Sequence, residues 1–452
     1  MPEPTVETLD SLDFISNDTF AKNGYPHAAW ARLRREAPIY WNTQHVDNPF
    51  WAVTKHADIV SISKQPELFH NGPRLAVLPE FKGPAAEEER VLRHLLNMDP
   101  PDHALYRKLV SHRFTPRGLG RMQRDIETIT GELLDAMAGD GSEQGGDFVE
   151  KLSAPLPLNV LAELLGVPRE MWPSMFQWTN EIAGAADPEY RLTGGFPKGT
   201  TERGLTGLLG HGARLATGGI GLHGLLSYFS RLVAQRREEP GDDFVSTLLA
   251  TEIDGERLTD EEVAYFCYLL LLAGNETTRN AISGGILAFL EHREEWERLR
   301  AEPGLLPTAV EEVLRWSSPV MHMARVAARD VEVRGQVIRA GEKVVLWYPS
   351  ANRDEEVFAE PYRFDIGRRP NEHLAFGYGE HFCLGSGLAR LQLRVMFETL
   401  AERLPDIVQA GEVERMRSTF VGGIKHLPVR FGATRGGVGR ACLRAKASGS
   451  VR

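Results

Sequence analysis

The chain has 452 residues, of which 42% are hydrophobic, so it is long enough to bury a large core. Its 52 lysines and arginines are outnumbered by 62 aspartates and glutamates, and the formal charge of −10 argues against a nucleic-acid partner. Three cysteines cannot build a disulfide framework, which indicates a reducing compartment. Residues 1–18 lack the apolar core of a signal peptide, and no run approaches the roughly 18 apolar residues of a spanning helix. We therefore expect a cytoplasmic protein without a membrane segment, with a monomer as the default.

Helical periodicity predominates along the chain. In chain order, we expect a strand at 50–54, helices at 121–138 and 260–292, strands at 330–333 and 343–346, and a helix at 387–403. Thr259 suits the N-cap of the second helix, and Glu262 stands where a capping box needs an acid. The balance predicts a mainly α fold with small β-sheets.

Two segments differ from the rest of the chain. Residues 190–224 contain eleven glycines, a density that disfavours helix and predicts a long mobile connection. Residues 433–452 lack apolar periodicity and predict a disordered tail, in which Cys442 has no expected function. We expect residues 1–432 to form a single domain.

A glycine-rich loop near the C-terminus surrounds one cysteine: residues 376–385 read Phe-Gly-Tyr-Gly-Glu-His-Phe-Cys-Leu-Gly. Glycines let the backbone approach a flat cofactor and turn its amides toward a sulfur. A lone thiolate on haem iron favours cleavage of the O–O bond. The alternative for Cys383 is a buried structural cysteine beside a turn, the usual role of a free cysteine.

This loop resembles the haem-binding loop of the bacterial cytochrome P-450 superfamily, and every fixed position of that pattern is filled. The resemblance extends from about residue 30 to 431 and includes five motifs in the expected order. It implies a triangular prism of helices around a buried haem b. It also implies that Cys383 is the iron ligand, that Phe376 and Gly385 pack beside it, and that His381 reaches a haem propionate.

A second motif, Ala273-Gly274-Asn275-Glu276-Thr277-Thr278, lies inside the 260–292 helix. An acid followed by an alcohol suits stepwise proton delivery during O–O cleavage, and Gly274 leaves a notch in the helix wall. A glycine and two threonines in a helix are otherwise ordinary packing residues. The segment resembles the family's central-helix pattern, which implies that Thr277 and Glu276 are the catalytic pair.

Further motifs supply scaffold and cofactor contacts. Glu312 and Arg315 are spaced for an i,i+3 pair with an apolar flank, and a buried pair of this kind needs a further partner. In the resembled family that partner is an upstream arginine, for which Arg368 is the candidate. His103 and Arg107 lie four residues apart on one helix face, and arginine suits carboxylates. The resemblance assigns both to haem propionates, together with Arg325.

By position in the family pattern, mostly apolar residues line the substrate space, which predicts a lipophilic substrate. The candidates are Leu75, Phe81, Leu269, Ala273, Val320, Met321, His322, Phe420 and Val421. His322 either donates a hydrogen bond to a substrate oxygen or is turned outward into a sheet or turn.

Because the chain ends after the haem domain, electrons are expected from a ferredoxin and its reductase. Cations that flank the expected proximal face suit an acidic partner; they are Arg113, Arg117, Arg121, Arg369 and Arg390.

The predicted function is a haem-thiolate monooxygenase that inserts one atom of O2 into a terpenoid or steroid-like molecule. Two alternatives remain: a tailoring oxidase of a polyketide or aromatic natural product, and a non-enzymatic haem-thiolate sensor. A sensor needs no acid–alcohol pair, and a peroxide-driven enzyme often replaces that pair.

Overall fold

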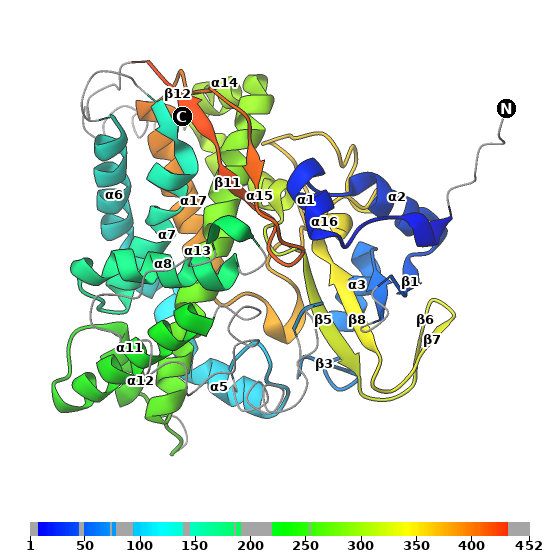
Figure 1. The fold of residues 1–452 in the computed structure, drawn as a ribbon, viewed down its shortest axis with the longest axis horizontal. Coiled ribbons are helices and arrows are strands. Elements are labelled where there is room, and N and C mark those ends of the chain that lie inside the picture. Colours follow the sequence, from blue (N-terminus) through cyan, green and yellow to red (C-terminus); the bar gives the residue numbers. More distant parts are fainter. Residues whose placement is uncertain are drawn as a thin grey trace, which may run out of the picture.

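A computed structural model describes residues 8–44, 49–72, 75–77, 94–138, 145–184, 187–190, 219–252 and 255–432. Figure 1 shows most helices gathered on one side of the molecule, while the largest sheet and the N-terminal helices form the other side. The predicted fold class, mainly α with small sheets, is confirmed. The expected tail at 433–452 and Phe81 lie outside the described residues.

The largest sheet has five strands in the order β1-β2-β8-β5-β3. Its strands are β1 (Ile39–Asn42), β2 (Phe50–Val53), β8 (Lys343–Trp347), β5 (His322–Ala327) and β3 (Phe69–His70). β2 pairs with β8 in parallel, and the other pairs are antiparallel. All five residues of β8 are buried, as expected for a central strand covered on both faces. The helices of this side are α1 (Asn17–Asn23), α2 (His27–Glu36), α3 (His56–Ser63) and α16 (Tyr348–Ala351).

The expected strand at 330–333 is one half of a hairpin formed by β6 (Val331–Val333) and β7 (Gln336–Ile338). Its turn residues Arg334 and Gly335 both have positive φ, 49° and 75°, as a two-residue turn that follows the strand twist requires. The strands predicted at 50–54 and 343–346 are confirmed to within one residue.

The helical side is built around α13 (Asp260–Glu291), a helix of 32 residues. The predicted capping box is confirmed: Thr259 Oγ1 accepts the Glu262 amide at 3.2 Å, and Glu262 accepts the Thr259 amide at 2.9 Å. α13 packs against α7, α8, α11, α15 and α17. The neighbouring helices are α5 (Asp102–Val110), α6 (Pro116–Ala138), α7 (Pro155–Leu164), α8 (Trp172–Ala183), α11 (Gly219–Glu238), α12 (Phe244–Ala250), α14 (Arg293–Ala301), α15 (Leu306–Ser317) and α17 (Ser386–Arg403).

Five short strands complete the fold, and Figure 1 shows the last of them running along the helical side. They are β4 (Gly145–Asp147), β9 (Val408–Gln409), β10 (Glu414–Arg415), β11 (Ile424–His426) and β12 (Pro428–Arg430). β12 joins β4 to β9, and β10 pairs with β11.

The expectation for the glycine-rich segment is wrong at its C-terminal end, where α11 begins at Gly219. A Cβ on Gly224 would lie 2.6 Å from the indole ring of Trp178, and one on Gly221 would lie 2.5 Å from the Trp178 carbonyl oxygen. These glycines therefore allow α11 to approach α8 closely instead of breaking a helix. Residues 191–218, the rest of that segment, lie outside the described residues.

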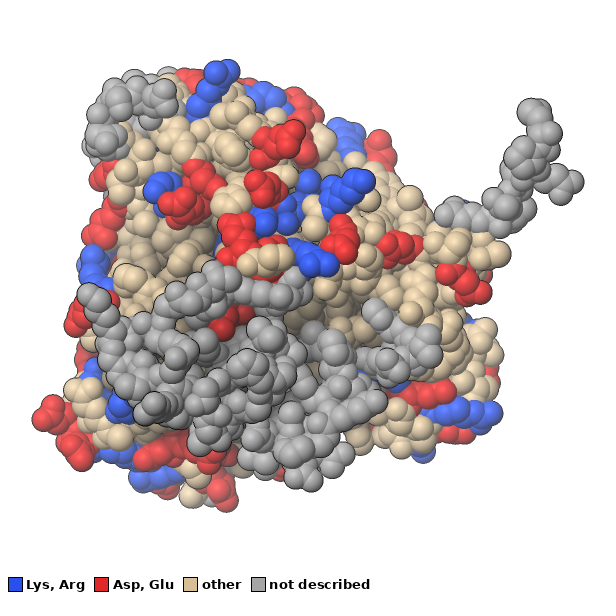
Figure 2. Space-filling model, viewed as in Figure 1, with Lys and Arg blue, Asp and Glu red and all other residues tan. Residues whose placement is uncertain are grey.

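Among the described residues, none of the helices combines the length and the apolar character needed to cross a bilayer. On the face seen in Figure 2, acidic and basic side chains alternate over the described surface. The net charge of −10 is therefore not gathered into one acidic patch there.

Candidate functional site

The Cys383 loop is a tight turn that leads into α17. The Cys383 amide donates to the carbonyl oxygen of Phe376 at 3.0 Å, which closes the loop. Gly377 and Gly379 have φ of 69° and 76°, the left-handed region that favours glycine. At Gly379 a Cβ would lie 2.1 Å from the carbonyl oxygen of Ser63, so no other residue fits there. The glycines thus fix the direction in which Cys383 is presented.

The surroundings of Cys383 act on its thiol in opposite directions. Burial raises the pKa of the Cys383 thiol, while the amides of Gly385 and Ser386 and the charges of Arg107 and Arg390 act to lower it. Amides and guanidinium groups aimed at a sulfur stabilise a thiolate. A bound metal ion deprotonates such a thiol outright, so the loop suits a metal thiolate.

Four basic side chains converge beside this loop: His103 and Arg107 from α5, Arg325 from β5, and His381 from the loop itself. The rings of His103 and His381 stack with centroids 4.0 Å apart. Burial and the nearby His103, Arg325 and Arg107 lower the pKa of His381 to about 3. Burial likewise lowers the pKa of His103. Arg107 donates to the carbonyl oxygen of Phe382 at 2.6 Å, which ties α5 to the loop.

This basic cluster contains buried ring nitrogens without a hydrogen-bond partner in the described part of the chain, namely the Nε2 atoms of His103 and His381. Arg325 is 6% exposed and donates to the backbone carbonyl of Ala324. Buried polar atoms without partners, beside two arginines, call for a polar ligand that carries negative charge. A haem carries two carboxylates on a flat ring and an iron that a thiolate can bind, so these residues fit a haem.

In the middle of α13, the Thr277 hydroxyl donates to the carbonyl oxygen of Ala273 at 2.7 Å, one turn earlier. Both residues are accessible, although most of the helix is buried. The side chains of Ala273 and Thr277 therefore share one accessible face of the helix. The notch expected at Gly274 is filled instead: a Cβ there would lie 2.9 Å from Leu161 of α7, so this glycine serves helix packing.

Glu276, the other member of the catalytic pair, lies in a buried ion pair. Its exposure is 2%, and Arg279 donates to its carboxylate at 3.2 Å. Arg279 also donates to Asn180 of α8 at 2.9 Å and to the Tyr190 hydroxyl oxygen. The carboxylate faces protein groups instead of solvent. A path for protons to Glu276 would run through this network.

The expected scaffold contact joins Glu312, Arg315 and Arg368. Arg315 donates to both carboxylate oxygens of Glu312 at 2.8 and 2.7 Å, and Arg368 adds bonds of 3.2 and 3.3 Å. Glu312 and Arg315 are fully buried. Nη1 of Arg315, the remaining guanidinium nitrogen, donates to the carbonyl oxygens of Asn352 and Pro361. The structure brings together all three residues named from the sequence.

Several candidate substrate residues meet at one place. Val320 and Val421 form an isolated bridge, and the Met321 amide donates to the carbonyl oxygen of Phe420 at 2.9 Å. The Leu75 carbonyl accepts the amide of Ala324, a residue of β5, at 2.6 Å. Leu269 is buried at 8% exposure on the α13 turn before Ala273.

Two of these candidates differ from expectation. Met321 is fully buried in the core beside the five-stranded sheet, so its side chain does not face open space. His322 points inward, not outward: its Nε2 accepts the Val77 amide at 3.0 Å, and its ring lies 4.8 Å from that of Trp347. Burial lowers the pKa of His322 to about 3. Because Nε2 accepts, the ring proton is on Nδ1, which is buried as well.

The arginines expected on the proximal face differ in whether the structure shows them free to bind a partner. Arg121 and Arg369 are exposed and have no acidic partner among the described residues. Arg390 is not a free cation, because its guanidinium pairs with Glu311 through two bonds of 2.7 and 2.8 Å. The side chains of Arg113 and Arg117 lie outside the described residues.

Three residues of these networks had no role assigned from the sequence: Arg279, Glu311 and His373. The i,i+3 spacing of Glu276 and Arg279 was a readable signal, although such pairs are common on exposed helices. Glu311 and His373 gave no local signal, because their partners lie in distant segments.

Comparison with known proteins identifies the family. The Cytochrome P450 family model matches residues 225–418. The steroid C26-monooxygenase of Mycobacterium tuberculosis is 37% identical over 441 residues, which cover 95% of this chain and 94% of that protein. The methyl-branched lipid omega-hydroxylase of the same species is 38% identical over 442 residues, which cover 95% of this chain and 96% of that protein. A Mycobacterium marinum cytochrome P450 in complex with pseudoionone has a TM-score of 0.81 and 37% identity, and covers 95% of this chain and 100% of its own. The chain therefore belongs to the cytochrome P450 family and is a monooxygenase with a haem-thiolate cofactor.

Proposed function

We propose that this monooxygenase hydroxylates the end of an apolar branched chain, either a steroid side chain or a methyl-branched lipid. One observation carries the proposal: two relatives that match nearly the whole chain are named for oxidation at the end of such chains. The largely apolar set around Leu269, Ala273, Val320 and Val421 supports it, because a saturated chain end offers no polar group to bind.

In this proposal each residue of the site has a defined task. Cys383 holds the iron, and Phe376 and Gly385 shape the loop that presents its sulfur. Four residues hold the carboxylates of the haem: His103, Arg107, Arg325 and His381. When bound, a haem with a thiolate ligand supplies the activation of O2 and the cleavage of its O–O bond.

The residues of α13 would handle the protons. The Thr277 hydroxyl lies on the accessible face of the helix, where it can donate a proton once its bond to the Ala273 carbonyl is exchanged. Glu276 holds a carboxylate one residue away, and Arg279 is its buried ion-pair partner. Arrival of a proton would therefore require the pair with Arg279 to loosen.

We further propose a ferredoxin and its reductase as the electron source, since cytochromes P450 need a redox partner. Arg121 and Arg369 support this, because exposed cations that have no ion-pair partner among the described residues attract an acidic protein. Replacing both by glutamate should slow reduction by ferredoxin at low salt, and the difference from wild type should shrink as salt rises. An unchanged rate at low salt would remove these arginines from the docking surface.

A spin-state titration of the purified ferric protein tests the substrate class. Cholesterol is compared with androstenedione, which lacks the branched side chain, and a methyl-branched fatty acid with its straight-chain counterpart. We expect a saturable shift from low to high spin with the branched member of at least one pair. A shift with the steroid nucleus alone, or with none of the four compounds, would overturn the proposal and favour a natural-product tailoring oxidase.

A further inference from the structure

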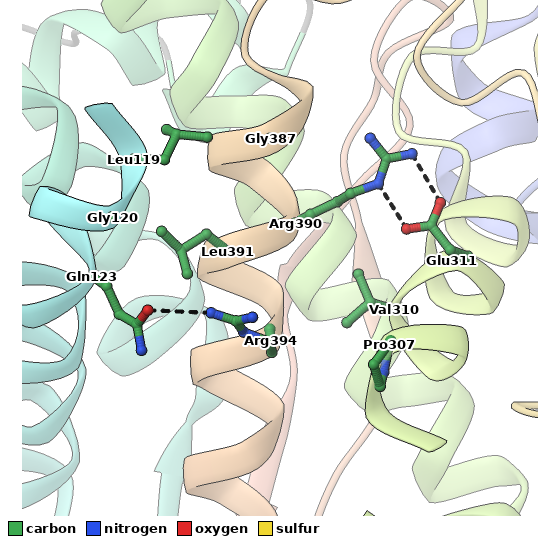
Figure 3. A pocket seen from close by; sticks show the side chains of 10 residues that line it. All are labelled: Leu119, Gly120, Gln123, Pro307, Val310, Glu311, Gly387, Arg390, Leu391 and Arg394. Atoms are coloured by element: carbon green, nitrogen blue, oxygen red, sulfur yellow. Dashed lines mark hydrogen bonds and ion pairs between the residues drawn. The ribbon is translucent and has the colours of Figure 1, made fainter. Parts of the chain in front are cut away.

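Two basic side chains, Arg390 and His373, bind one carboxylate, that of Glu311, near the Cys383 loop. Glu311 of α15 accepts two parallel bonds from Arg390 of α17, at 2.7 Å from Nε and 2.8 Å from Nη2. His373 lies 3.0 Å from the same carboxylate through its Nε2. Figure 3 shows the Glu311–Arg390 pair at the edge of an open cavity of about 330 Å³ that α6, α15 and α17 line. Two parallel bonds define one orientation of the guanidinium.

The hydrogen bonds also fix the tautomer of His373. Its Nδ1 accepts the Ala375 amide at 3.2 Å, so Nε2 carries the proton and donates to Glu311. His373 is almost fully buried, with 3% of its side chain exposed. Partial burial acts to raise the pKa of Glu311, but the hydrogen bonds from Arg390 and His373 and the charge of Arg390 outweigh it and lower that pKa to about 2. The carboxylate is therefore ionised at neutral pH and holds both partners.

Both partners of Glu311 contact Phe376. The centre of the Arg390 guanidinium lies 4.5 Å from the centroid of the Phe376 ring, within the range of a cation–π contact. The His373 ring lies 6.0 Å from the same ring at an angle of 48°. The carbonyl oxygen of Phe376 accepts the Cys383 amide. One carboxylate is thus connected, through two side chains and one aromatic ring, to the backbone of Cys383.

We propose that Glu311, Arg390 and His373 form a clamp that positions Phe376 and thereby the sulfur of Cys383. All three are positioning residues, and none of them touches the reacting atoms. The inference rests on the proposed role of Cys383 as the iron ligand. It gives Arg390 a different task from that of a docking cation, because Glu311 neutralises its charge locally and holds it against the ring.

The test uses the haem-loaded protein and its ferrous–CO spectrum, which distinguishes thiolate-bound iron from iron that has lost the thiolate. The conversion between the two forms is timed in mild denaturant, while far-ultraviolet circular dichroism follows global unfolding. The variants are Glu311→Gln, Arg390→Gln and the double variant. Arg390→Lys keeps the positive charge but cannot form the two parallel bonds to Glu311. The matched control is Arg394→Gln, one turn further along α17 on the same cavity, where the arginine has only a 3.4 Å bond to Gln123.

The clamp predicts that Glu311→Gln and Arg390→Gln each lose the thiolate spectrum about tenfold faster than wild type, before global unfolding. The double variant should be no faster than the faster single variant, because both changes break one unit. Arg390→Lys should restore part of the lifetime, and Arg394→Gln should match wild type.

Two results would overturn the clamp: Arg390→Gln behaving like Arg394→Gln, or fully additive single changes. If Arg390→Gln fails to hold haem, the same comparison is made between Arg390→Lys and an Arg394→Lys control. A wild-type protein without a thiolate spectrum would instead refute the assignment of Cys383, which keeps the two failures distinct.

Discussion

Replacing Glu312 by glutamine removes one charge from a fully buried network without changing its shape. The carboxylate accepts two bonds from Arg315, and further bonds from Arg368, the Asp365 amide at 2.9 Å and Asn371 at 3.1 Å. A glutamine retains one oxygen and turns an NH2 group toward some of these donors. The change therefore leaves two guanidinium groups without a countercharge and at least one buried donor without an acceptor.

Breaking a buried ion pair on one side costs about 3–5 kcal/mol, so Glu312→Gln should lower the free energy of unfolding by about that amount. Glu297 of α14 is the matched control, because it also pairs with two arginines, at 2.8 Å to Arg293 and 2.6 Å to Arg300, but is half exposed. Glu297→Gln should cost less than about 1 kcal/mol.

Denaturant unfolding followed by tryptophan fluorescence measures both variants under the same conditions. If Glu312→Gln lies within about 1 kcal/mol of wild type, the network does not stabilise the fold as its burial indicates. The same would follow if both variants lost equal stability, since burial would then make no difference.

Two further predictions concern proton transfer and pH. Thr277→Ala should divert reducing equivalents from product to hydrogen peroxide, while Thr277→Ser, which keeps a hydroxyl, should not; full coupling in the alanine variant would contradict the proton role. Burial opposes protonation of His426, but the carboxylates of Asp147 and Glu189 prevail and raise its pKa. The contribution of His426 to the free energy of unfolding should therefore be full below about pH 6.5. It should be lost as the pH rises through the higher pKa of His426 in the folded state. The unfolding free energy of wild type minus His426→Gln, measured from acid to alkaline pH, checks this, and a flat difference would refute it.

Local patterns were predictable from the sequence because they depend on neighbouring residues. The capping box of Thr259 and Glu262 and the strand at 50–53 are of this kind. The Glu312–Arg315–Arg368 contact was named only through the resemblance to a family, since its third member lies 56 residues from the first. The spacing of the residues alone predicted the i,i+3 pair of Glu312 and Arg315, but not its third member.

Features formed by distant segments were missed or misjudged. Glycines 221 and 224 predict a broken helix when read alone, and only the packing of α11 on Trp178 explains them. The inward orientation of His322, whose Nε2 accepts the Val77 amide, could not be read from its neighbours in the sequence. Glu311 and Arg390 are 79 residues apart, so no local pattern connects them. Residue types indicated the chemistry, whereas tertiary contacts decided which side chains are free to take part in it.

The central claim is that one oxygen atom of O2 enters the end of a branched apolar chain. The direct measurement is turnover under isotopically labelled O2, with ferredoxin, its reductase and a steroid that carries a branched side chain, followed by mass spectrometry of product fragments. We expect one labelled oxygen on a terminal carbon of the side chain. Label on the ring system, or product whose oxygen comes from water, would contradict the account.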